Sequence, residues 1–153
     1  MANDDLVFTG GCLCGAARFQ VKGPPIRAAY CHCTLCQRQH SAAFVHTVHW
    51  DASAFNWGLF LPEEILDSYA TPQKPWKMSW RCKTCGVGIA NENTKKRKWA
   101  IWGTLFDRGE DGKIKNWEVM KPTSHWFYDT RILDVNDDLS KWLAYEDESE
   151  RLG

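Results

Sequence analysis

The sequence has no excess of charge, no long hydrophobic run and no internal repeat. Lys and Arg together number 19 among 153 residues, and so do Asp and Glu. A chain without net charge has no overall field to attract nucleic acid or an anionic membrane. Its apolar runs, such as Trp99–Trp102, fall far short of the ~20 residues that a membrane-spanning helix needs. We therefore expect neither nucleic acid nor a membrane as a partner.

The N-terminal segment lacks the basic stretch and apolar core of a secretory signal. It reads Met1-Ala2-Asn3-Asp4-Asp5, which is polar and acidic. We expect a cytoplasmic protein, whose thiols stay reduced and rarely form structural disulfides. Because no linker or low-complexity block divides the sequence, we also expect one domain over residues 6–145. A charged tail, 146–153, is expected to fray.

Short strand-like stretches alternate with turn signals, which is typical of a mainly β domain. We expect strands at 6–12, 16–22, 26–31, 43–50, 66–70, 77–82, 88–91, 98–105, 124–128 and 131–135. Two short helices are expected, one at 34–39 and one at 138–145, where Asn136 or Asp137 would be the N-cap. Most of the nine tryptophans should fill the core, because a small β domain needs bulky side chains.

Seven cysteines are the most informative feature, because they fall into three tight groups. The groups are Cys12-x-Cys14, Cys31-x-Cys33-x-x-Cys36 and Cys82-x-x-Cys85, the last followed by Gly86 as a turn residue. An odd number excludes a fully paired disulfide framework. Scattered free cysteines often serve as small buried apolar residues, but seven in such clusters argue against that role. Residues i and i+2 of a strand share a face, so these spacings suit metal binding.

The seven thiolates divide most simply into a closed zinc site and an open one. The closed site would comprise Cys12, Cys14, Cys82 and Cys85, and the open one Cys31, Cys33 and Cys36. Four protein ligands are typical of structural zinc, whereas three ligands plus water or substrate are typical of catalytic zinc. We therefore expect two zinc ions per chain, one structural and one catalytic.

A histidine that completes the second group would instead make both sites structural. The candidates near the three cysteines are His32, His40, His46 and His49. His32 lies between two ligands on an expected strand, so its side chain should face away from the metal. His40, four residues after Cys36, is the best placed of the four to be a fourth ligand.

The segments that carry the cysteines resemble those of the glutathione-dependent formaldehyde-activating enzyme family, whose members share the Mss-four-like fold. The similar segments are Gly11–Gly15 with Ala17–Phe19, the C-H-C-x-x-C-x-R signature at Cys31–Arg38, the C-x-x-C-G knuckle at Arg81–Gly86, Ile101–Leu105 and Pro122–His125. The resemblance implies a mainly β fold of small antiparallel sheets held by the four-cysteine zinc site, with one or two short helices. It also implies that Cys12, Cys14, Cys82 and Cys85 hold the structural zinc and that Cys31, Cys33 and Cys36 hold the catalytic one, the same division that the cysteine spacing suggests.

The resemblance further implies a carbon–sulfur lyase. Glutathione's thiol would add to formaldehyde to give S-hydroxymethylglutathione, or the adduct would be cleaved in reverse. A related carbonyl compound would suit the same chemistry. The residues expected to act beside Cys31, Cys33 and Cys36 are His32 or His40 as the acid/base and Arg38 with Gln37 as substrate-binding groups.

The rival hypothesis is a non-catalytic zinc-binding interaction module of the same fold, and an inactive enzyme-like scaffold is a third. Lys95–Lys98 beside Trp99 could bind single-stranded nucleic acid, but it reads more simply as a solvated hairpin loop. The exposed edges of a small β domain are compatible with a homodimer. The fourth coordination position discriminates between the first two hypotheses, because only an enzyme needs it open.

Overall fold

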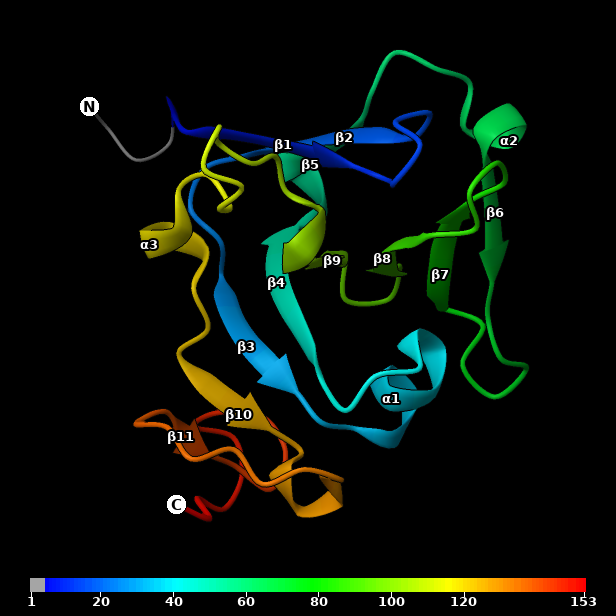
Figure 1. The fold of residues 1–153 in the computed structure, drawn as a ribbon. Helices are drawn as coiled ribbons and strands as arrows, with labels where there is room; N and C mark the ends of the chain where they lie inside the picture. The colour runs from blue at the N-terminus through cyan, green and yellow to red at the C-terminus, as the bar shows by residue number, and fades with distance from the viewer. Residues whose placement is uncertain (1–4) are drawn as a thin grey trace.

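The structure, a computed structural model, describes residues 5–153 and is mainly β. Figure 1 shows the two sheets, and residues of both contribute to the main hydrophobic core. The smaller sheet has the order β1-β2-β5, with strands β1 (Val7–Gly11), β2 (Arg18–Lys22) and β5 (Phe55–Trp57). The larger sheet has the order β11-β10-β3-β4-β9-β8-β7-β6, with strands β3 (Arg27–Cys31), β4 (Val45–Asp51), β6 (Leu66–Tyr69), β7 (Lys77–Cys82), β8 (Gly88–Asn93), β9 (Lys98–Trp102), β10 (Ser124–Trp126) and β11 (Ser140–Lys141).

Three short α-helices and three 3-10 turns connect the strands. They are α1 (Thr34–His40), α2 (Pro62–Ile65), α3 (Trp117–Met120), η2 (Ala52–Ala54), η3 (Gly103–Leu105) and η4 (Tyr128–Thr130). No helix within residues 5–153 is long and apolar enough to cross a membrane. The predicted mainly β class is confirmed, and nine of the ten predicted strands overlap strands of the structure.

The larger sheet is mixed rather than purely antiparallel. β10 runs parallel to both β3 and β11, whereas every other described pair of strands is antiparallel. The parallel arrangement places His125 beside Tyr30 and Trp126 beside Cys31. A segment near the C-terminal end of the chain thereby reaches the strand that ends in the first cysteine of the second group.

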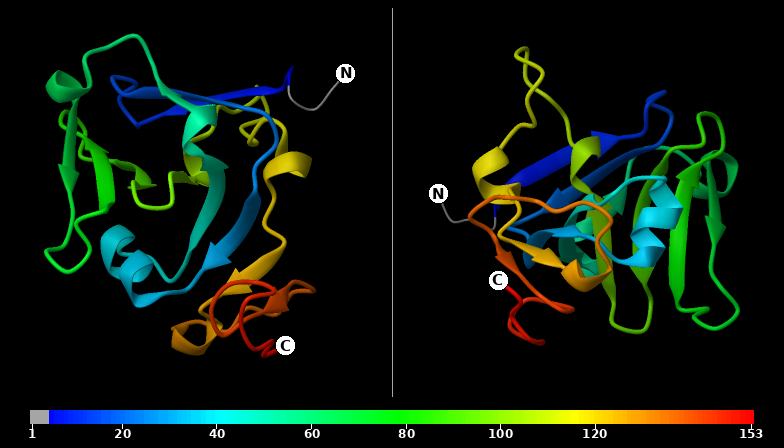
Figure 2. Two further views of the ribbon diagram at one scale, coloured as in Figure 1. Left: turned by 180° about the vertical axis from the view of Figure 1, so that it is seen from behind. Right: turned by 60° about the horizontal axis from the view of Figure 1, so that its bottom comes forward.

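The helix predicted at 34–39 is confirmed as α1. Its N-cap is Cys33, whose Sγ accepts a hydrogen bond from the Cys36 amide at 3.3 Å. It ends at Ser41, which is in the left-handed conformation with φ of 50°. The side chains of Gln39 and Asn91 bond at 3.1 Å and hold α1 against β8 (Figure 2).

The two predictions within residues 131–145 are wrong. No strand forms at 131–135, and the segment 138–145 is not a helix. Asp137, a predicted N-cap, accepts a hydrogen bond from the Leu139 amide in an Asx turn, after which the chain enters β11. Pairing with β10 therefore overrides the local helical preference. Residues 146–153 fold back, so that the Leu143 amide donates to the Glu150 carbonyl at 2.9 Å. The domain boundary at 6–145 and the fraying of the tail stay predictions.

The core lies between the smaller sheet and one face of the larger sheet. Phe19 from β2 packs edge-on against Phe106 at 5.2 Å between ring centroids. Trp99 from β9 stacks on Phe55 at 3.9 Å. Aromatic pairs of this kind add to the stabilisation that burial provides. Trp50, also in this core, is 1% exposed.

A charged contact joins the smaller sheet to the segment that follows η3. Arg18 donates two hydrogen bonds to the Asp107 carboxylate, at 2.7 and 2.8 Å. The Thr9 hydroxyl donates to the same carboxylate, and the Asp107 amide donates to the Thr9 carbonyl at 3.0 Å. The hydrogen bond from Arg18, above all, lowers the pKa of Asp107 below its usual value.

Replacement of Asp107 by Asn should lower the free energy of unfolding at pH 7 by about 0.5–1 kcal/mol, because the pair is partly exposed and screened. Since the folded pKa of Asp107 is depressed, its stabilising contribution is present above pH 3.8 and is lost as pH falls through the folded pKa. Urea unfolding of the wild type and Asp107→Asn at pH 7 and pH 2.5 measures this. Equal stabilities at pH 7, or a gap at pH 2.5 as large as at pH 7, would contradict the assignment.

Candidate metal centres

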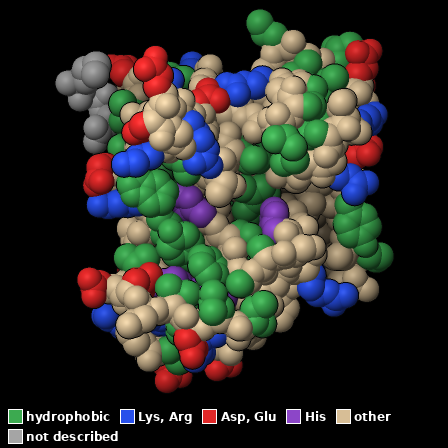
Figure 3. Space-filling view, viewed as in Figure 1, with side chains coloured by type: hydrophobic (Ala, Val, Ile, Leu, Met, Phe, Trp, Pro, Cys, Tyr) green, Lys and Arg blue, Asp and Glu red, His purple; other side chains and the backbone are tan. Residues whose placement is uncertain are grey.

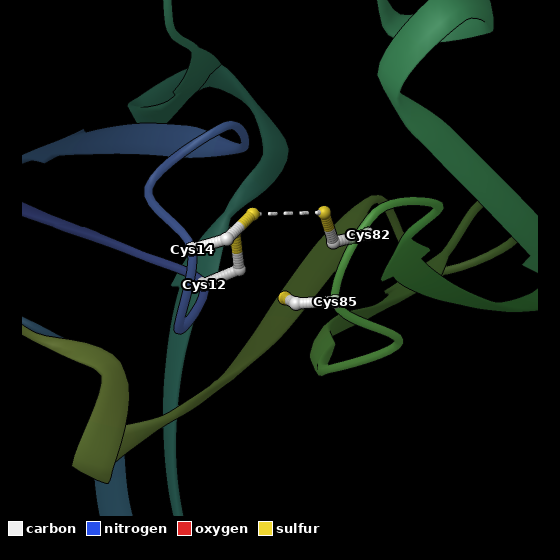
Figure 4. A group of neighbouring side chains, drawn as sticks. All are labelled: Cys12, Cys14, Cys82 and Cys85. Atoms are coloured by element: carbon white, nitrogen blue, oxygen red, sulfur yellow. Dashed lines mark hydrogen bonds between the residues drawn. The ribbon is translucent and has the colours of Figure 1, made fainter.

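Four cysteine sulfurs converge between two turns that are far apart in the sequence (Figure 4). Cys12 and Cys14 follow β1, Cys82 ends β7, and Cys85 lies in the turn before β8. All four Sγ atoms lie within 4.8 Å of one another. The Sγ atoms of Cys12 and Cys14 are 3.6 Å apart, and those of Cys14 and Cys82 are 3.7 Å apart.

These separations match a tetrahedral zinc site. Zinc–sulfur bonds of ~2.3 Å in a tetrahedron place the sulfurs about 3.8 Å apart. A disulfide would instead bring two sulfurs to about 2.05 Å. The four thiols therefore fit a metal ion without rearrangement.

The backbone of both turns is shaped for this convergence. Gly15 and Gly86 have φ of 81° and 75°, which side chains with a Cβ rarely adopt. The Ala17 amide donates to Cys12 Sγ at 3.3 Å and holds this sulfur in place within the first turn. The Gly86 amide donates to the Cys82 carbonyl at 2.9 Å and closes the second turn.

The three remaining cysteines form a second group beside α1. Cys31 ends β3, Cys33 caps α1, and Cys36 lies in its first turn. Their Sγ atoms lie within 4.8 Å of one another, and no fourth Cys, His, Asp or Glu of residues 5–153 joins them. Cys31 and Cys36 are buried, whereas Cys33 is half-buried. We call these three residues the cysteine triplet.

Within the triplet the negative charge favours Cys33. Hydrogen bonds from the Cys31 and Cys36 thiols lower the pKa of Cys33, and the Cys36 amide adds to the effect. The pKa of Cys36 is raised, because its thiol hydrogen-bonds to Cys31 and Cys33 and because it is buried. Three thiols this close together are suited to binding a divalent cation. The cation binds thiolates, so the three sulfurs then no longer need to share protons.

His32 faces away from the triplet, as the strand periodicity predicts. Its Nε2 lies 2.8 Å from Nδ1 of His125 on β10, and the ring is fully buried. Burial, together with the charges of His125 and Arg131, lowers the pKa of His32 to about 4. His32 therefore lies next to the cysteines in sequence, but its ring is held by another strand.

His40 lies on the same side of α1 as Cys36, one turn further along. Its ring packs edge-on against Trp102, with 4.3 Å between ring centroids. His40 Nε2 and Trp102 Nε1 are buried, and neither has a hydrogen-bond partner among the described residues. Burial lowers the pKa of His40, while the negative charge of Cys33 partly opposes the shift.

Trp102 was not singled out from the sequence, although it belongs to the Ile101–Leu105 segment. Its ring packs with Cys31 and Cys36 in a small cluster separate from the main core. A Cβ built on Gly88 would lie 3.8 Å from His40 Cε1 and 4.0 Å from Trp102 Nε1, so both rings face a stretch of backbone without a side chain. Figure 3 shows a hollow over β4, β9 and β8, lined in part by histidine and hydrophobic side chains.

Two further residues of the predicted site have different surroundings. The Gln37 side-chain amide donates to the carbonyls of His32 at 2.6 Å and Thr130 at 2.9 Å, and so attaches α1 to the end of β3 and to η4. Arg38 is exposed and forms no ion pair with a carboxylate of residues 5–153.

The other two candidate fourth ligands are bonded elsewhere. His46 Nε2 lies 2.8 Å from the Met120 carbonyl oxygen, and His49 Nε2 lies 3.0 Å from the Thr47 hydroxyl. Neither belongs to the metal-competent groups of the described residues. The triplet thus stands as three cysteines, with His40 and Trp102 as its polar neighbours.

Comparisons with known proteins agree with this arrangement. A crystal structure of a Rhodobacter sphaeroides protein is similar over 69% of this chain and 96% of that chain, with 19% sequence identity and a TM-score of 0.52, a likeness that concerns the fold. A search of curated proteins gave no match. The family model described as glutathione-dependent formaldehyde-activating enzyme matches residues 7–130, a range that contains all seven cysteines. The chain therefore belongs to the glutathione-dependent formaldehyde-activating enzyme family.

Proposed function

We propose that this protein is a zinc-dependent carbon–sulfur lyase that forms or cleaves the thiol adduct of formaldehyde, or of a related carbonyl compound, with glutathione or a similar thiol. The observation that carries the proposal is the triplet of converging cysteines that no fourth protein ligand of residues 5–153 joins. Three protein ligands are the pattern of catalytic zinc. Family membership supports the same chemistry. A cytoplasmic location, where thiols stay reduced, suits a thiol substrate.

Cys31, Cys33 and Cys36 would hold the catalytic zinc, and the four-cysteine group would hold a structural one. The catalytic ion would supply a binding position for the thiol sulfur or the carbonyl oxygen and would lower the pKa of the thiol. Three thiolates leave the group with net negative charge, which favours binding of a thiol over strong polarisation of a carbonyl. The half-buried Cys33 lies where a substrate from the solvent can approach.

The reaction needs a group that carries one proton. When the sulfur attacks the carbonyl carbon, a carbon–sulfur bond forms, the C=O π bond breaks, and the proton lost by the thiol ends on the oxygen. His40 suits this task better than His32, because its Nε2 has no hydrogen-bond partner among residues 5–153 and lies on the triplet side of α1. The Trp102 indole N–H, a donor only, would donate to the same oxygen.

Substrate recognition falls to residues at the exposed side of α1. Arg38 would pair with a carboxylate of the thiol compound, since a guanidinium binds carboxylates in a bidentate manner. Gln37 would act indirectly, because its amide nitrogen already bonds two carbonyls of the protein. The aldehyde would lie near Gly88, which bears no side chain and faces both His40 and Trp102.

A matched pair of cysteine variants separates the two metal sites. Cys33→Ser should lower the zinc content from two ions per chain to one, abolish turnover of glutathione with formaldehyde, and leave the fold intact. Cys85→Ser should also lose one zinc, but with a loss of stability above about 4 kcal/mol, since removal of a structural metal belongs to the most damaging changes. Zinc analysis, exchange NMR of the adduct and urea unfolding provide the readouts. One zinc ion per chain in both the wild type and Cys33→Ser would contradict the enzyme proposal and favour a non-catalytic zinc-binding interaction module.

His40→Gln tests the proton carrier. The catalysed rate should fall by about 10²–10⁴, the usual contribution of general acid–base catalysis, while the zinc content stays at two. The matched control is His49→Gln, which removes another half-buried histidine, on β4 and hydrogen-bonded to Thr47. A drop to one zinc in His40→Gln would instead make His40 a ligand and the second site a closed one. Unchanged turnover would exclude His40 as the acid/base.

A further inference from the structure

Two histidines and a carboxylate form a line behind the cysteine triplet. His32 Nε2 lies 2.8 Å from His125 Nδ1, and His125 Nε2 lies 2.8 Å from Asp137 Oδ2. Both imidazoles are 0% exposed, whereas the Asp137 side chain is 31% exposed. The line thus runs from the surface to the residue between two of the three cysteines. We call it the His32–His125–Asp137 triad.

The carboxylate fixes the direction of both hydrogen bonds. Asp137 also accepts a hydrogen bond from Lys141 Nζ at 2.8 Å and, as an ionised carboxylate, can only accept. His125 Nε2 is therefore the donor to Asp137, and in a neutral ring Nδ1 is then the acceptor. His32 must donate from Nε2, so one carboxylate sets the tautomer of both rings.

Aromatic side chains enclose the two rings. His32 stacks on Phe44 at 4.7 Å between centroids and meets Tyr128 edge-on at 5.1 Å. His125 lies 5.3 Å from the ring of Tyr30. In these surroundings a buried imidazole N–H without a partner would cost about 1–3 kcal/mol, so the bond to His125 holds the His32 ring in a single orientation.

The backbone of His32 is held as firmly as its ring. Its amide donates to the Trp126 carbonyl at 2.9 Å. Its carbonyl accepts from Gln37 Nε2 at 2.6 Å and from the Thr130 hydroxyl at 3.0 Å. Cys31 and Cys33 are the direct neighbours of His32, and their side chains point to the other side of the chain. Holding the backbone of His32 in place therefore sets the positions of two of the three thiols.

We infer that the His32–His125–Asp137 triad positions the cysteine triplet for its metal, an inference that rests on the proposed zinc site. The triad acts through the backbone of the ligand segment, as outer hydrogen-bond partners orient metal ligands elsewhere. Asp137 lies beyond residues 7–130, the part of the chain that the family model matches. The C-terminal segment of this chain therefore supports the cysteine triplet through hydrogen bonds on the side opposite the thiols.

Release of zinc to a colorimetric chelator, from protein purified with two zinc ions, tests the inference. Cys33→Ser is expected to keep only the zinc of the four-cysteine site, so its single release phase identifies the phase of that site. Asp137→Ala should speed release from the triplet about tenfold to a hundredfold, the usual effect of losing an outer-shell partner, and leave the other phase unchanged. Asp137→Asn keeps an oxygen that accepts from His125 and should restore slow release. Lys141→Met removes the neighbouring ion pair but not the triad, and should release zinc as the wild type does.

Three results would overturn the inference. Wild-type release from Asp137→Ala, with two zinc ions bound, would refute the positioning role and leave the proposed function standing. Equal acceleration of both phases would show general destabilisation rather than positioning, and so would failure of Asp137→Asn to restore slow release. A wild-type protein that binds only one zinc would refute the proposed function and the inference together.

Discussion

The structure depends on the convergence of four cysteine sulfurs from two turns about 70 residues apart. Cys12 and Cys82 also belong to the main hydrophobic cluster, so the four thiols and the apolar core meet at the same junction between the two sheets. A cross-link between distant positions restricts the unfolded chain most strongly when the enclosed loop is long. The enclosed segment includes β3, α1 and β4, the elements that carry and support the cysteine triplet.

The two cysteine groups have similar chemistry but different surroundings. Glycine turns and main-chain amides shape the four-cysteine group, and its ligands come from two separate turns. The triplet comes from one continuous segment and needs support from elsewhere: Gln37 attaches α1, and β10 holds His32. Beside the triplet, His40 Nε2 and Trp102 Nε1 are buried without a hydrogen-bond partner among residues 5–153, and the same holds for Trp80 Nε1 in the cluster that contains Cys82. The contrast fits one metal that stabilises the fold and one that meets a substrate.

Local patterns predicted both cysteine groups, most strands and the orientation of His32, because each follows from spacing along one segment. The triad could not be predicted from the sequence, because His125 and His32 are 93 residues apart and come together through a parallel strand pairing that no local pattern specifies. The same pairing explains the wrong helix at 138–145, where bonding to β10 decides the conformation. Trp102 is one of nine tryptophans, and periodicity alone does not separate the one beside the triplet from those in the core.

The central claim is that this chain holds one closed and one three-cysteine metal site. Anomalous diffraction at the zinc absorption edge, on crystals grown without chelator, tests it most directly. The account predicts two peaks per chain: one within bonding distance of four cysteine sulfurs, and one bonded to Cys31, Cys33 and Cys36 together with a ligand from outside the protein. A single peak, or a second peak that is also bonded to His40, would contradict it.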